Sequence, residues 1–300
     1  MTEGALGFAS ETTRFAACQT LADALDTCGI GDPRLDARLL ICAAADIDHA
    51  ELVRRPELSL GKTAARRLAS YATRRIAREP VSRILGSRGF WDLDLIVTSA
   101  VLDPRPDTET LVEAACDVLV SRREAALRIA DLGTGSGALL CALLREFPKA
   151  TGIGVELSAM ACDVARHNLR RCGLAFRGDV IEGDWTASSG RCFDLVVANP
   201  PYIATEAISS LAPEVRDYDP WLALDGGADG LAAYSALAAL LPTILDDEGV
   251  AILEFGAGQG EAVRSLLWNA GLSKTSLRQD FSGQARAIVV FPSHRGRSEA

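Results

Sequence analysis

Hydrophobic side chains recur every three to four positions along residues 12–78, which is the spacing of a helix with one buried face. Two such segments, TLADALDTCGI and DARLLICAAADI, are separated by turn residues between Gly29 and Pro33. A further helical segment runs from about Lys62 and is stopped by Pro80. The pattern predicts a small all-helical domain over residues 1–78.

The pattern changes after this helical region. Over residues 79–105, apolar residues alternate with polar ones and are broken by glycine and proline, which is typical of a β-hairpin or connector. A helix follows, with Asp107 or Thr108 as its candidate N-cap. From there, over residues 106–300, strand-like and helix-like segments alternate. This rhythm predicts an α/β domain with a doubly wound, mostly parallel sheet.

Composition narrows the class of protein. The 300 residues are 48% hydrophobic and 24% charged, as in ordinary globular proteins. No apolar run approaches the roughly 18 residues that a membrane-spanning helix needs. The first residues show no basic stretch followed by an apolar one, so we expect a cytoplasmic protein without a membrane partner.

The net charge of −9 is unevenly distributed. Residues 1–78 carry 11 basic and 10 acidic side chains, whereas the remaining residues carry 20 basic and 30 acidic ones. Because proteins that grip nucleic acid by its phosphates are usually basic, we expect no direct DNA binding. The helix starting near Lys62 is an exception, and it is either a solvated face or a docking surface for an acidic or RNA-bearing partner. Its basic residues are Lys62, Arg66, Arg67, Arg74, Arg75 and Arg78.

Metal chemistry is not expected. None of the eight cysteines forms a C-x-x-C pair, and the three histidines are scattered at positions 49, 167 and 294. This distribution lacks the ligand spacing of zinc sites.

The segment IADLGTGSGALL places three glycines between a strand and a helix, where glycine lets the backbone approach a ligand closely. The next strand ends at Glu156, 23 residues after Gly133, and a carboxylate there can accept hydrogen bonds from both hydroxyls of a ribose. NAD and S-adenosylmethionine both use this geometry. The spacing differs from the phosphate-binding G-x-G-x-x-G, and no Arg or Lys stands near the loop, so a ligand without phosphates fits better.

A third strand end supplies Asp184 and Trp185, which can flank an adenine, one by hydrogen bonding and one by packing. Trp185 alone is also compatible with a buried structural role. The segment FDLVVANPPYIATE then ends a buried strand in Asn199, two prolines and Tyr202. Because proline cannot extend a sheet ladder and fixes its own backbone angle, this tip is rigid. Its amide, carbonyls and ring are suited to hold a planar NH2 group.

Together these motifs carry a family resemblance. DLGTGSG, the acid at the next strand end, GDW and NPPY, in this order, resemble class I S-adenosylmethionine-dependent methyltransferases that act on planar nitrogens. The segments from Glu79 to Glu113, Tyr218 to Tyr234 and Leu253 to Val263 resemble, more narrowly, the protein-glutamine methyltransferases that modify peptide chain release factors. The resemblance runs from about Leu39 to Arg286.

This resemblance implies a fold, a reaction and partners. The expected fold has a seven-stranded sheet, a small N-terminal helical domain for substrate recognition and a hairpin connector. The expected reaction transfers a methyl group from S-adenosylmethionine, without a metal, to the glutamine side chain in the Gly-Gly-Gln motif of class I release factors. The expected products are the methylated release factor, which tunes translation termination, and S-adenosylhomocysteine. We expect the enzyme to be a monomer.

The resemblance also implies roles for individual residues. Asn199, Pro200 and Tyr202 are expected to be catalytic, and with Pro201 they are expected to bind the substrate amide. The family more usually has Asp where this chain has Glu156. The expected cofactor-binding residues are Asp131, Gly133, Thr134, Gly135, Ser136, Gly137, Glu156, Asp184, Trp185 and Asn199.

An amide nitrogen is a poor nucleophile, so positioning has to supply most of the catalysis, and orientation of reactants can contribute ~7–11 kcal/mol. The side chain of Asn199 and the carbonyl of Pro200 can each accept one N–H of the amide, which directs its lone pair at the methyl carbon. Pro201 keeps these carbonyls in place, and Tyr202 offers a face for the flat amide.

Three alternatives remain open. Exocyclic amines of nucleobases share the Asn-Pro-Pro-Tyr chemistry, but base extrusion usually needs a basic recognition domain. A related family methylates a glutamine of a large-subunit ribosomal protein, and the connector segment PRPDTE (Pro104 to Glu109) favours the release-factor family instead. A non-catalytic binding module with this fold is the third alternative.

Overall fold

The computed structural model describes residues 6–292, and the ends of the predicted terminal domains, residues 1–5 and 293–300, lie outside the described residues. The contacts within the chain divide it into two compact units. The first comprises the described residues up to Gly86 together with Pro213–Tyr218, and the second comprises Ser87–Ala212 and the described residues from Asp219 onward.

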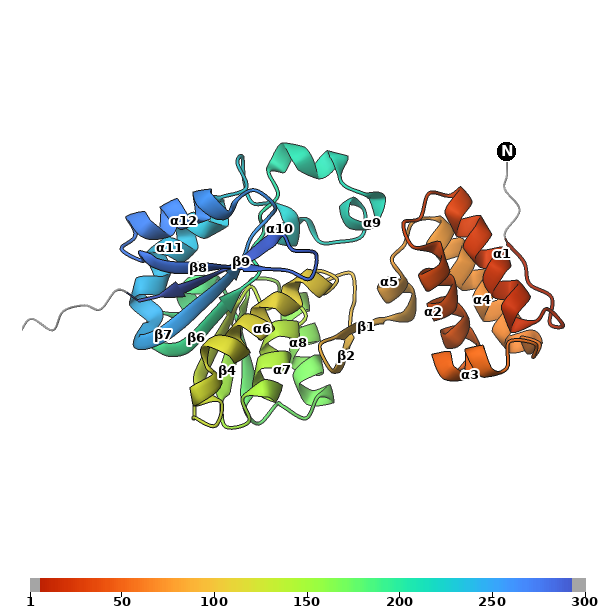
Figure 1. Ribbon diagram of the computed structural model, residues 1–300, viewed down its shortest axis with the longest axis horizontal. Helices are drawn as coiled ribbons and strands as arrows, with labels where there is room; N and C mark the ends of the chain where they lie inside the picture. The colour runs from red at the N-terminus through yellow and green to blue at the C-terminus, as the bar shows by residue number, and fades with distance from the viewer. Residues whose placement is uncertain (1–5, 293–300) are drawn as a thin grey trace, which may run out of the picture. The chain divides into compact units, whose positions relative to one another are not determined.

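The first unit is helical, as the sequence predicted (Figure 1). Its core is a cluster of buried aliphatic side chains that includes Leu21, Leu40 and Leu68. Asp32 caps α2 by accepting a hydrogen bond from the amide of Leu35 at 3.2 Å. The helices of this unit are α1 (Arg14–Thr27), α2 (Pro33–Ala45), α3 (His49–Arg54), α4 (Gly61–Ile76), α5 (Val81–Leu85) and α9 (Pro213–Arg216).

Part of the basic segment that contains α4 is used inside this unit. The buried guanidinium of Arg75 lies 2.7 Å from Asp36 and 3.2 Å from Glu214. Arg78 pairs with the same Glu214 at 2.9 Å. These residues therefore form a network that holds α9 with α4 and α2, rather than a solvated face.

The second unit contains a seven-stranded sheet in the order β5-β4-β3-β6-β7-β9-β8, which confirms the predicted fold class. In this sheet β9 runs in the opposite direction to the other strands. A separate antiparallel hairpin is formed by β1 (Ser87–Phe90) and β2 (Leu93–Ile96). The sheet strands are β3 (Arg128–Leu132), β4 (Thr151–Glu156), β5 (Gly178–Glu182), β6 (Phe193–Ala198), β7 (Leu245–Glu254), β8 (Lys274–Gln279) and β9 (Ala285–Phe291).

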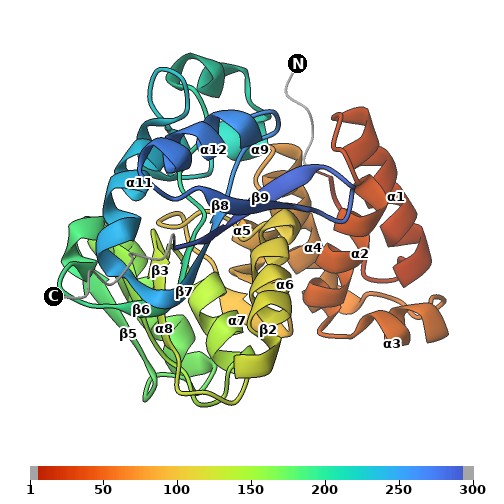
Figure 2. The same ribbon diagram turned by 60° about the vertical axis from the view of Figure 1, so that its left-hand side comes forward.

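Helices cover both faces of this sheet (Figure 1, Figure 2). Successive strand residues point to opposite faces, so Ile129 belongs to one buried cluster and Ala130 to the other. One face packs against α6 (Glu109–Val118), α7 (Ala138–Glu146) and α8 (Ala159–Arg171), and the other against α11 (Ala232–Ile244) and α12 (Gly260–Asn269). The short helices are η1 (Pro106–Thr108), η2 (Val120–Arg122), η3 (Trp185–Ser188), η4 (Thr205–Ser210) and α10 (Trp221–Leu224).

The order of the strands fixes where a ligand can bind. After β3 the chain continues to β4 and β5 on one side, and after β5 it returns to β6 on the other side of β3. Crevices at the carboxyl ends of strands open at such a reversal of strand order. The predicted motifs stand at the ends of β3, β4, β5 and β6 or directly after them, so the topology brings all of them to this edge. Within residues 6–292, no helix has the length and apolar character needed to cross a membrane.

Candidate active site

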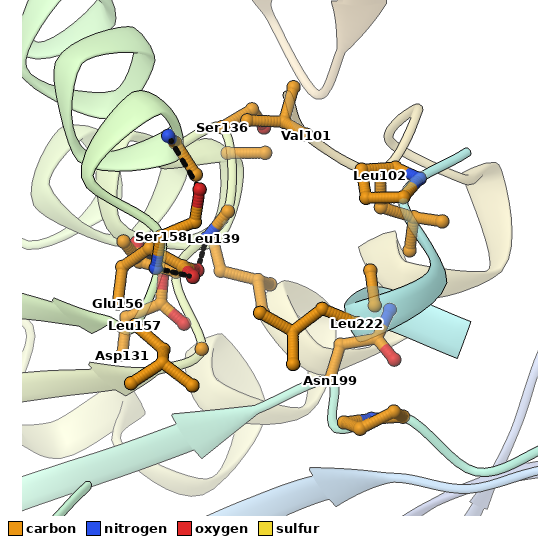
Figure 3. Close-up of a pocket in the computed structure, with 18 of the residues that line it drawn as sticks. Val101, Leu102, Asp131, Ser136, Leu139, Glu156, Leu157, Ser158, Asn199 and Leu222 are labelled. Atoms are coloured by element: carbon orange, nitrogen blue, oxygen red, sulfur yellow. Dashed lines mark hydrogen bonds between the residues drawn. The ribbon is translucent and has the colours of Figure 1, made fainter. Parts of the chain in front are cut away.

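A cavity of about 560 Å³ lies at this edge of the sheet, within the second unit. Figure 3 shows Asp131 and Glu156 on one side of it and Asn199 and Leu222 on the other. Of the predicted site residues, Gly137, Pro200 and Tyr202 do not line the cavity. Those that line it are Asp131, Gly133, Thr134, Gly135, Ser136, Glu156, Asp184, Trp185, Asn199 and Pro201.

The glycine loop has a backbone that side chains with a Cβ rarely adopt, since φ is +79° at Gly133 and +54° at Gly135. The amide of Gly133 donates to the carbonyl of Val155 at 2.8 Å, which ties the loop to β4. Gly137, in contrast, serves the packing of two helices. A Cβ there would lie 3.3 Å from atoms of Ala165, so this glycine allows α7 to pack closely on α8.

Glu156 closes the loop from the end of β4. Its Oε2 accepts a hydrogen bond from the amide of Gly135 at 2.9 Å, and its Oε1 accepts one from the amide of Ser158 at 2.9 Å (Figure 3). Each carboxylate oxygen can accept more than one hydrogen bond, so both retain capacity for a ligand. The longer arm of Glu is therefore used to reach back to the glycine loop.

Asp131 lies deeper, at the end of β3, with only 1% of its surface exposed. Its Oδ2 accepts hydrogen bonds from the hydroxyl of Thr134 at 2.5 Å and from the amide of Leu140 at 3.2 Å. Its Oδ1 accepts none from the described residues. Burial raises the pKa of this carboxyl to about 7, against the hydrogen bonds that lower it. An unpaired buried oxygen that lines a cavity is suited to a cationic ligand group.

The residues that follow β5, Asp184 and Trp185, also contribute to the local structure. Asp184 is the N-cap of η3 and accepts a hydrogen bond from the amide of Thr186 at 2.8 Å. Hydrogen bonds from the Thr186 hydroxyl and amide lower the pKa of Asp184. Trp185 lines the cavity and also packs against the core cluster beneath α11. Trp185 is therefore half-buried with part of its surface on the cavity, and its role beside an adenine stays a prediction.

Asn199 follows β6 and points its amide toward α6. Its Nδ2 donates to the hydroxyl of Thr108 at 3.0 Å. Thr108 is the N-cap residue of α6, which confirms one of the two candidates, but its side chain makes no capping hydrogen bond. The preceding turn η1 already places Thr108 in a helical conformation, which turns its hydroxyl away from the α6 amides and leaves it for Asn199.

The prediction missed residues that support the NPPY segment from behind. Gln259 donates from Nε2 to the carbonyl of Tyr202 at 2.9 Å and accepts from the amide of Gly256 at 2.9 Å. A Cβ at Gly230 would lie 2.4 Å from the carbonyl oxygen of Tyr202, so only glycine fits there. These residues lie in the two segments, Tyr218 to Tyr234 and Leu253 to Val263, that carried the family resemblance without an assigned role.

The other missed residues make the cavity largely apolar. They come from the hairpin, the connector that follows it, the start of α8 and α10, and the sequence signal for them was only their hydrophobicity. Their apolar surface can take up a ligand with uncharged, planar parts. They include Phe90, Val101, Leu102, Leu157, Met160 and Leu222.

These features fit S-adenosylmethionine. The unpaired oxygen of Asp131 suits an ammonium group, Glu156 suits ribose hydroxyls, and the volume lies in the range of about 300–1,000 Å³ that is typical for such ligands. No cluster of His, Cys, Asp and Glu side chains that could hold a metal ion occurs in the part of the chain that the structure describes.

Family models match both units. The model described as the PrmC N-terminal domain matches residues 16–86, and the model described as the methyltransferase small domain matches residues 108–214. Among solved structures, the catalytic domain of hMettl16 in complex with MAT2A 3′UTR hairpin 6 is similar in fold. Its TM-score is 0.50 at 13% identity, covering 66% of this chain and 74% of that one.

Relatives of known activity match almost the whole chain. The release factor glutamine methyltransferase of Rhodospirillum rubrum is 45% identical over 89% of this chain and 81% of its own length. Proteins of the same name from Caulobacter vibrioides and Moorella thermoacetica are 43% and 38% identical, over 89% and 88% of this chain and 92% and 93% of their own lengths. The chain therefore belongs to the release factor glutamine methyltransferase family and is an S-adenosylmethionine-dependent methyltransferase.

Proposed function

We propose that this protein methylates the side-chain amide nitrogen of the glutamine in the Gly-Gly-Gln motif of class I peptide chain release factors, and thereby tunes translation termination. The names of its relatives support this substrate. The acidic balance of the methyltransferase part argues against nucleic acid as the substrate.

One observation carries the proposal. The Nδ2 of Asn199 donates one of its two N–H groups to Thr108, which sets the plane of this amide and leaves Oδ1 as its acceptor for a ligand in the cavity. An acceptor at the tip of a rigid loop, next to the carbonyl of Pro200, is suited to hold the two N–H groups of a primary amide. The glutamine side chain is the protein group with this geometry that the family acts on.

The residues of this chain act by orientation. When bound, S-adenosylmethionine supplies an electrophilic methyl group. Asn199 and the carbonyl of Pro200 accept the two N–H bonds of the substrate amide, which turns the nitrogen lone pair toward that methyl group. The same acceptors favour the positive charge that develops on nitrogen in the transition state. Tyr202 and Pro201 keep the segment rigid, with Gln259 holding the Tyr202 carbonyl.

We propose that Asp131, Glu156, Asp184 and Trp185 hold the cofactor together with the glycine loop, and that S-adenosylhomocysteine leaves as product without participation of a metal. The helices within residues 1–78 and the connector at 79–105 would recognise the release factor, and residues 106–300 would carry the chemistry. We propose that the enzyme works as a monomer in the cytoplasm, where its substrates act.

The test is methyl transfer from labelled S-adenosylmethionine to a purified release factor and to the same factor with Gly-Gly-Gln changed to Gly-Gly-Ala. We expect label on the first protein and none on the second. Label on the Ala version would place the methyl group on another residue. Label on ribosomal protein or on nucleic acid, with none on either release factor, would favour the alternative substrates.

A further inference from the structure

Two parallel strands end side by side behind the NPPY segment. Ala198 of β6 pairs with Leu253 of β7, so the next residues, Asn199 and Glu254, are neighbours at the edge of the sheet that carries the cavity. Asn199 lines the cavity, whereas Glu254 lies behind it with 1% of its surface exposed. A carboxyl group at that depth requires partners, because an unpaired buried charge is strongly unfavourable.

The partners of Glu254 come from the elements that position the substrate. The hydroxyl of Tyr202 donates to its Oε1 at 3.4 Å, and Oε2 accepts no hydrogen bond from the described residues. Burial raises the pKa of Glu254 to about 7, and hydrogen bonding from Thr108 followed by the charge of Arg286 opposes that rise. Thr108 thus interacts with the carboxyl of Glu254 and is hydrogen-bonded to the amide of Asn199.

The direction of these hydrogen bonds matters. A hydroxyl has one proton to donate, and Thr108 receives a proton from Nδ2 of Asn199. Ionised Glu254 can only accept, and its Oε2 has no hydrogen-bond partner among the described residues, so it is available for the proton of Thr108 while the Thr108 lone pair faces Asn199. This order fixes Nδ2 of Asn199 on the Thr108 side and leaves Oδ1 for the substrate.

We propose that Glu254 is a positioning residue that acts through Thr108 to fix the orientation of the Asn199 amide. This role rests on the proposed function, because the orientation matters only if Oδ1 has to accept an N–H of the substrate. Protonated Glu254 could donate to Thr108 instead. Thr108 could then donate to Oδ1 of a rotated Asn199. The rotated Asn199 would present its own NH2 group to the NH2 group of the substrate amide, so the hydrogen bond between Asn199 and the substrate would be lost.

The charged and titratable groups around Glu254 determine how readily its carboxyl group ionises. Arg286 of β9 stabilises the anion, while Asp107 of η1 opposes it. Arg286 is itself held by Asp107 at 3.2 Å and by Asp280 at 3.3 Å. Tyr202 donates to this carboxyl, whereas Tyr234 donates to the backbone carbonyl of Glu254 at 2.9 Å. Because the pKa is raised to about 7, the ionised form is lost as pH falls through that value.

The first test compares kcat and KM of wild type and Glu254→Gln for methylation of a release factor between about pH 5.5 and 8.5. In wild type, kcat should fall as pH drops below about 7, whereas in Glu254→Gln it should be about 10- to 100-fold lower at pH 8 and lack this acidic limb. KM for the release factor should stay within about threefold, because binding of the protein surface is unaffected. Thermal unfolding checks that the variant folds.

A second set of variants changes Thr108, which stands between Glu254 and Asn199 in the proposed series of hydrogen bonds. Thr108→Val removes the hydroxyl and should lower kcat by at least about tenfold, and Thr108→Ser, which keeps it, should recover most of that loss. Thr110→Val is the matched control, since the Thr110 hydroxyl is buried one residue into α6 and has no hydrogen-bond partner among the described residues.

Each outcome separates the inference from the function on which it rests. Wild-type kcat and an unchanged pH profile in Glu254→Gln, with an active wild type, would overturn the role of Glu254 alone. Equal losses in the Val and Ser variants would also overturn it, because a packing role does not distinguish a hydroxyl. A wild type that leaves the Gly-Gly-Gln glutamine unmethylated would overturn the proposed function and the inference together.

Discussion

Two carboxyl groups of the site, Asp131 and Glu254, are almost entirely removed from water, and burial raises the pKa of each to about 7. Such a group keeps its proton to higher pH in the folded chain than in the unfolded one, where the ordinary values are 3.8 and 4.5. The folded state therefore binds more protons between these values and about pH 7. Stability must fall as pH rises through this window.

Asp131→Asn should remove the Asp131 part of this dependence. At pH 8 we expect the variant to be more stable than wild type by about 1–3 kcal/mol, and this advantage should shrink as pH falls toward the ordinary value of 3.8, below which Asp131 is protonated in the folded and the unfolded chain alike. Affinity for S-adenosylmethionine should fall by about tenfold, since a neutral amide replaces an anion facing an ammonium group.

Thermal unfolding between pH 5 and pH 8 measures the first effect, and titration calorimetry at pH 8 measures the second. A variant with the pH profile and cofactor affinity of wild type would show that Asp131 is not the buried anion of this site.

The sequence predicted the residues whose chemistry is visible in a local motif. Asp131, Glu156 and Asn199 each stand at a strand end in a recognisable pattern, and the structure brings them to one cavity. Asp107 or Thr108 was expected as the N-cap of α6, and Thr108 holds that position without making a capping hydrogen bond. Its partner is instead Asn199, 91 residues away. Contacts over such distances leave no periodic signal, and neither Thr108 nor Glu254 could be assigned to the site.

At the scale of elements, β4 is built to let the glycine loop approach it. A Cβ added at Gly154 would lie 2.7 Å from Cγ2 and 2.9 Å from Oγ1 of Thr134. Since Thr134 also donates to Asp131, a displacement of its side chain would disturb the cofactor side of the cavity. The absence of a side chain on this strand therefore supports the shape of the site.

Gly154→Ala should overpack this contact at a cost of about 1–3 kcal/mol, which corresponds to a fall in Tm of roughly 2–4 °C per kcal/mol for a domain of this size. Cofactor affinity should fall with it. Gly89→Ala is the control, because a Cβ there meets nothing within 4 Å and should change neither quantity. Equal Tm and equal affinity in both variants would mean that Thr134 can move aside without consequence.

The alternation of helices and strands predicted the α/β layers and the hairpin, but not every strand. β8 pairs with β9 at the edge of the sheet, and its side chains are exposed or only half-buried. A strand with little buried surface lacks the apolar signal by which the inner strands were recognised. The position of β9 between β7 and β8 follows from tertiary packing, which a local pattern does not contain.

At the scale of the whole molecule, residues 213–218 belong to the helical unit although they follow the NPPY segment in sequence. Glu214 binds Arg75, 139 positions away, and the hydroxyl of Tyr218 donates to the carbonyl of Ala77 at 2.8 Å. Burial opposes ionisation of Glu214, but its own backbone hydrogen bond, Arg75 and Arg78 together lower its pKa. No spacing in the sequence could have predicted this grouping.

Two arginines of α4 form ion pairs inside the helical unit, so the hypothesis of a docking surface on α4 narrows to its other basic residues. Arg74 donates to both oxygens of Glu79, and Arg75 is buried, so these charges serve the unit itself. Arg66 and Arg67 are exposed. Changing both to Glu should raise KM for an intact release factor by about tenfold at low salt, with a smaller effect at high salt, because surface charges act mainly on association.

Affinity for S-adenosylmethionine should not change in this variant. Reversal of Lys149 and Arg191, two exposed cations outside the helical unit, controls for the loss of positive charge alone. The same rise in KM in the control, or no rise in the α4 variant, would leave α4 as a solvated face.

The central claim is that Asn199 holds the substrate amide by accepting its N–H, without acting as a base. The most direct measurement is the single-turnover rate of methyl transfer to a release factor by wild type, Asn199→Ala and Asn199→Asp, each shown to be folded by thermal unfolding. We expect Asn199→Ala to lose about 10²-fold or more of the rate. Asn199→Asp should also be slowed, because it removes the donor to Thr108 and sets a second anion beside Glu254. A wild-type rate in Asn199→Ala would contradict the account.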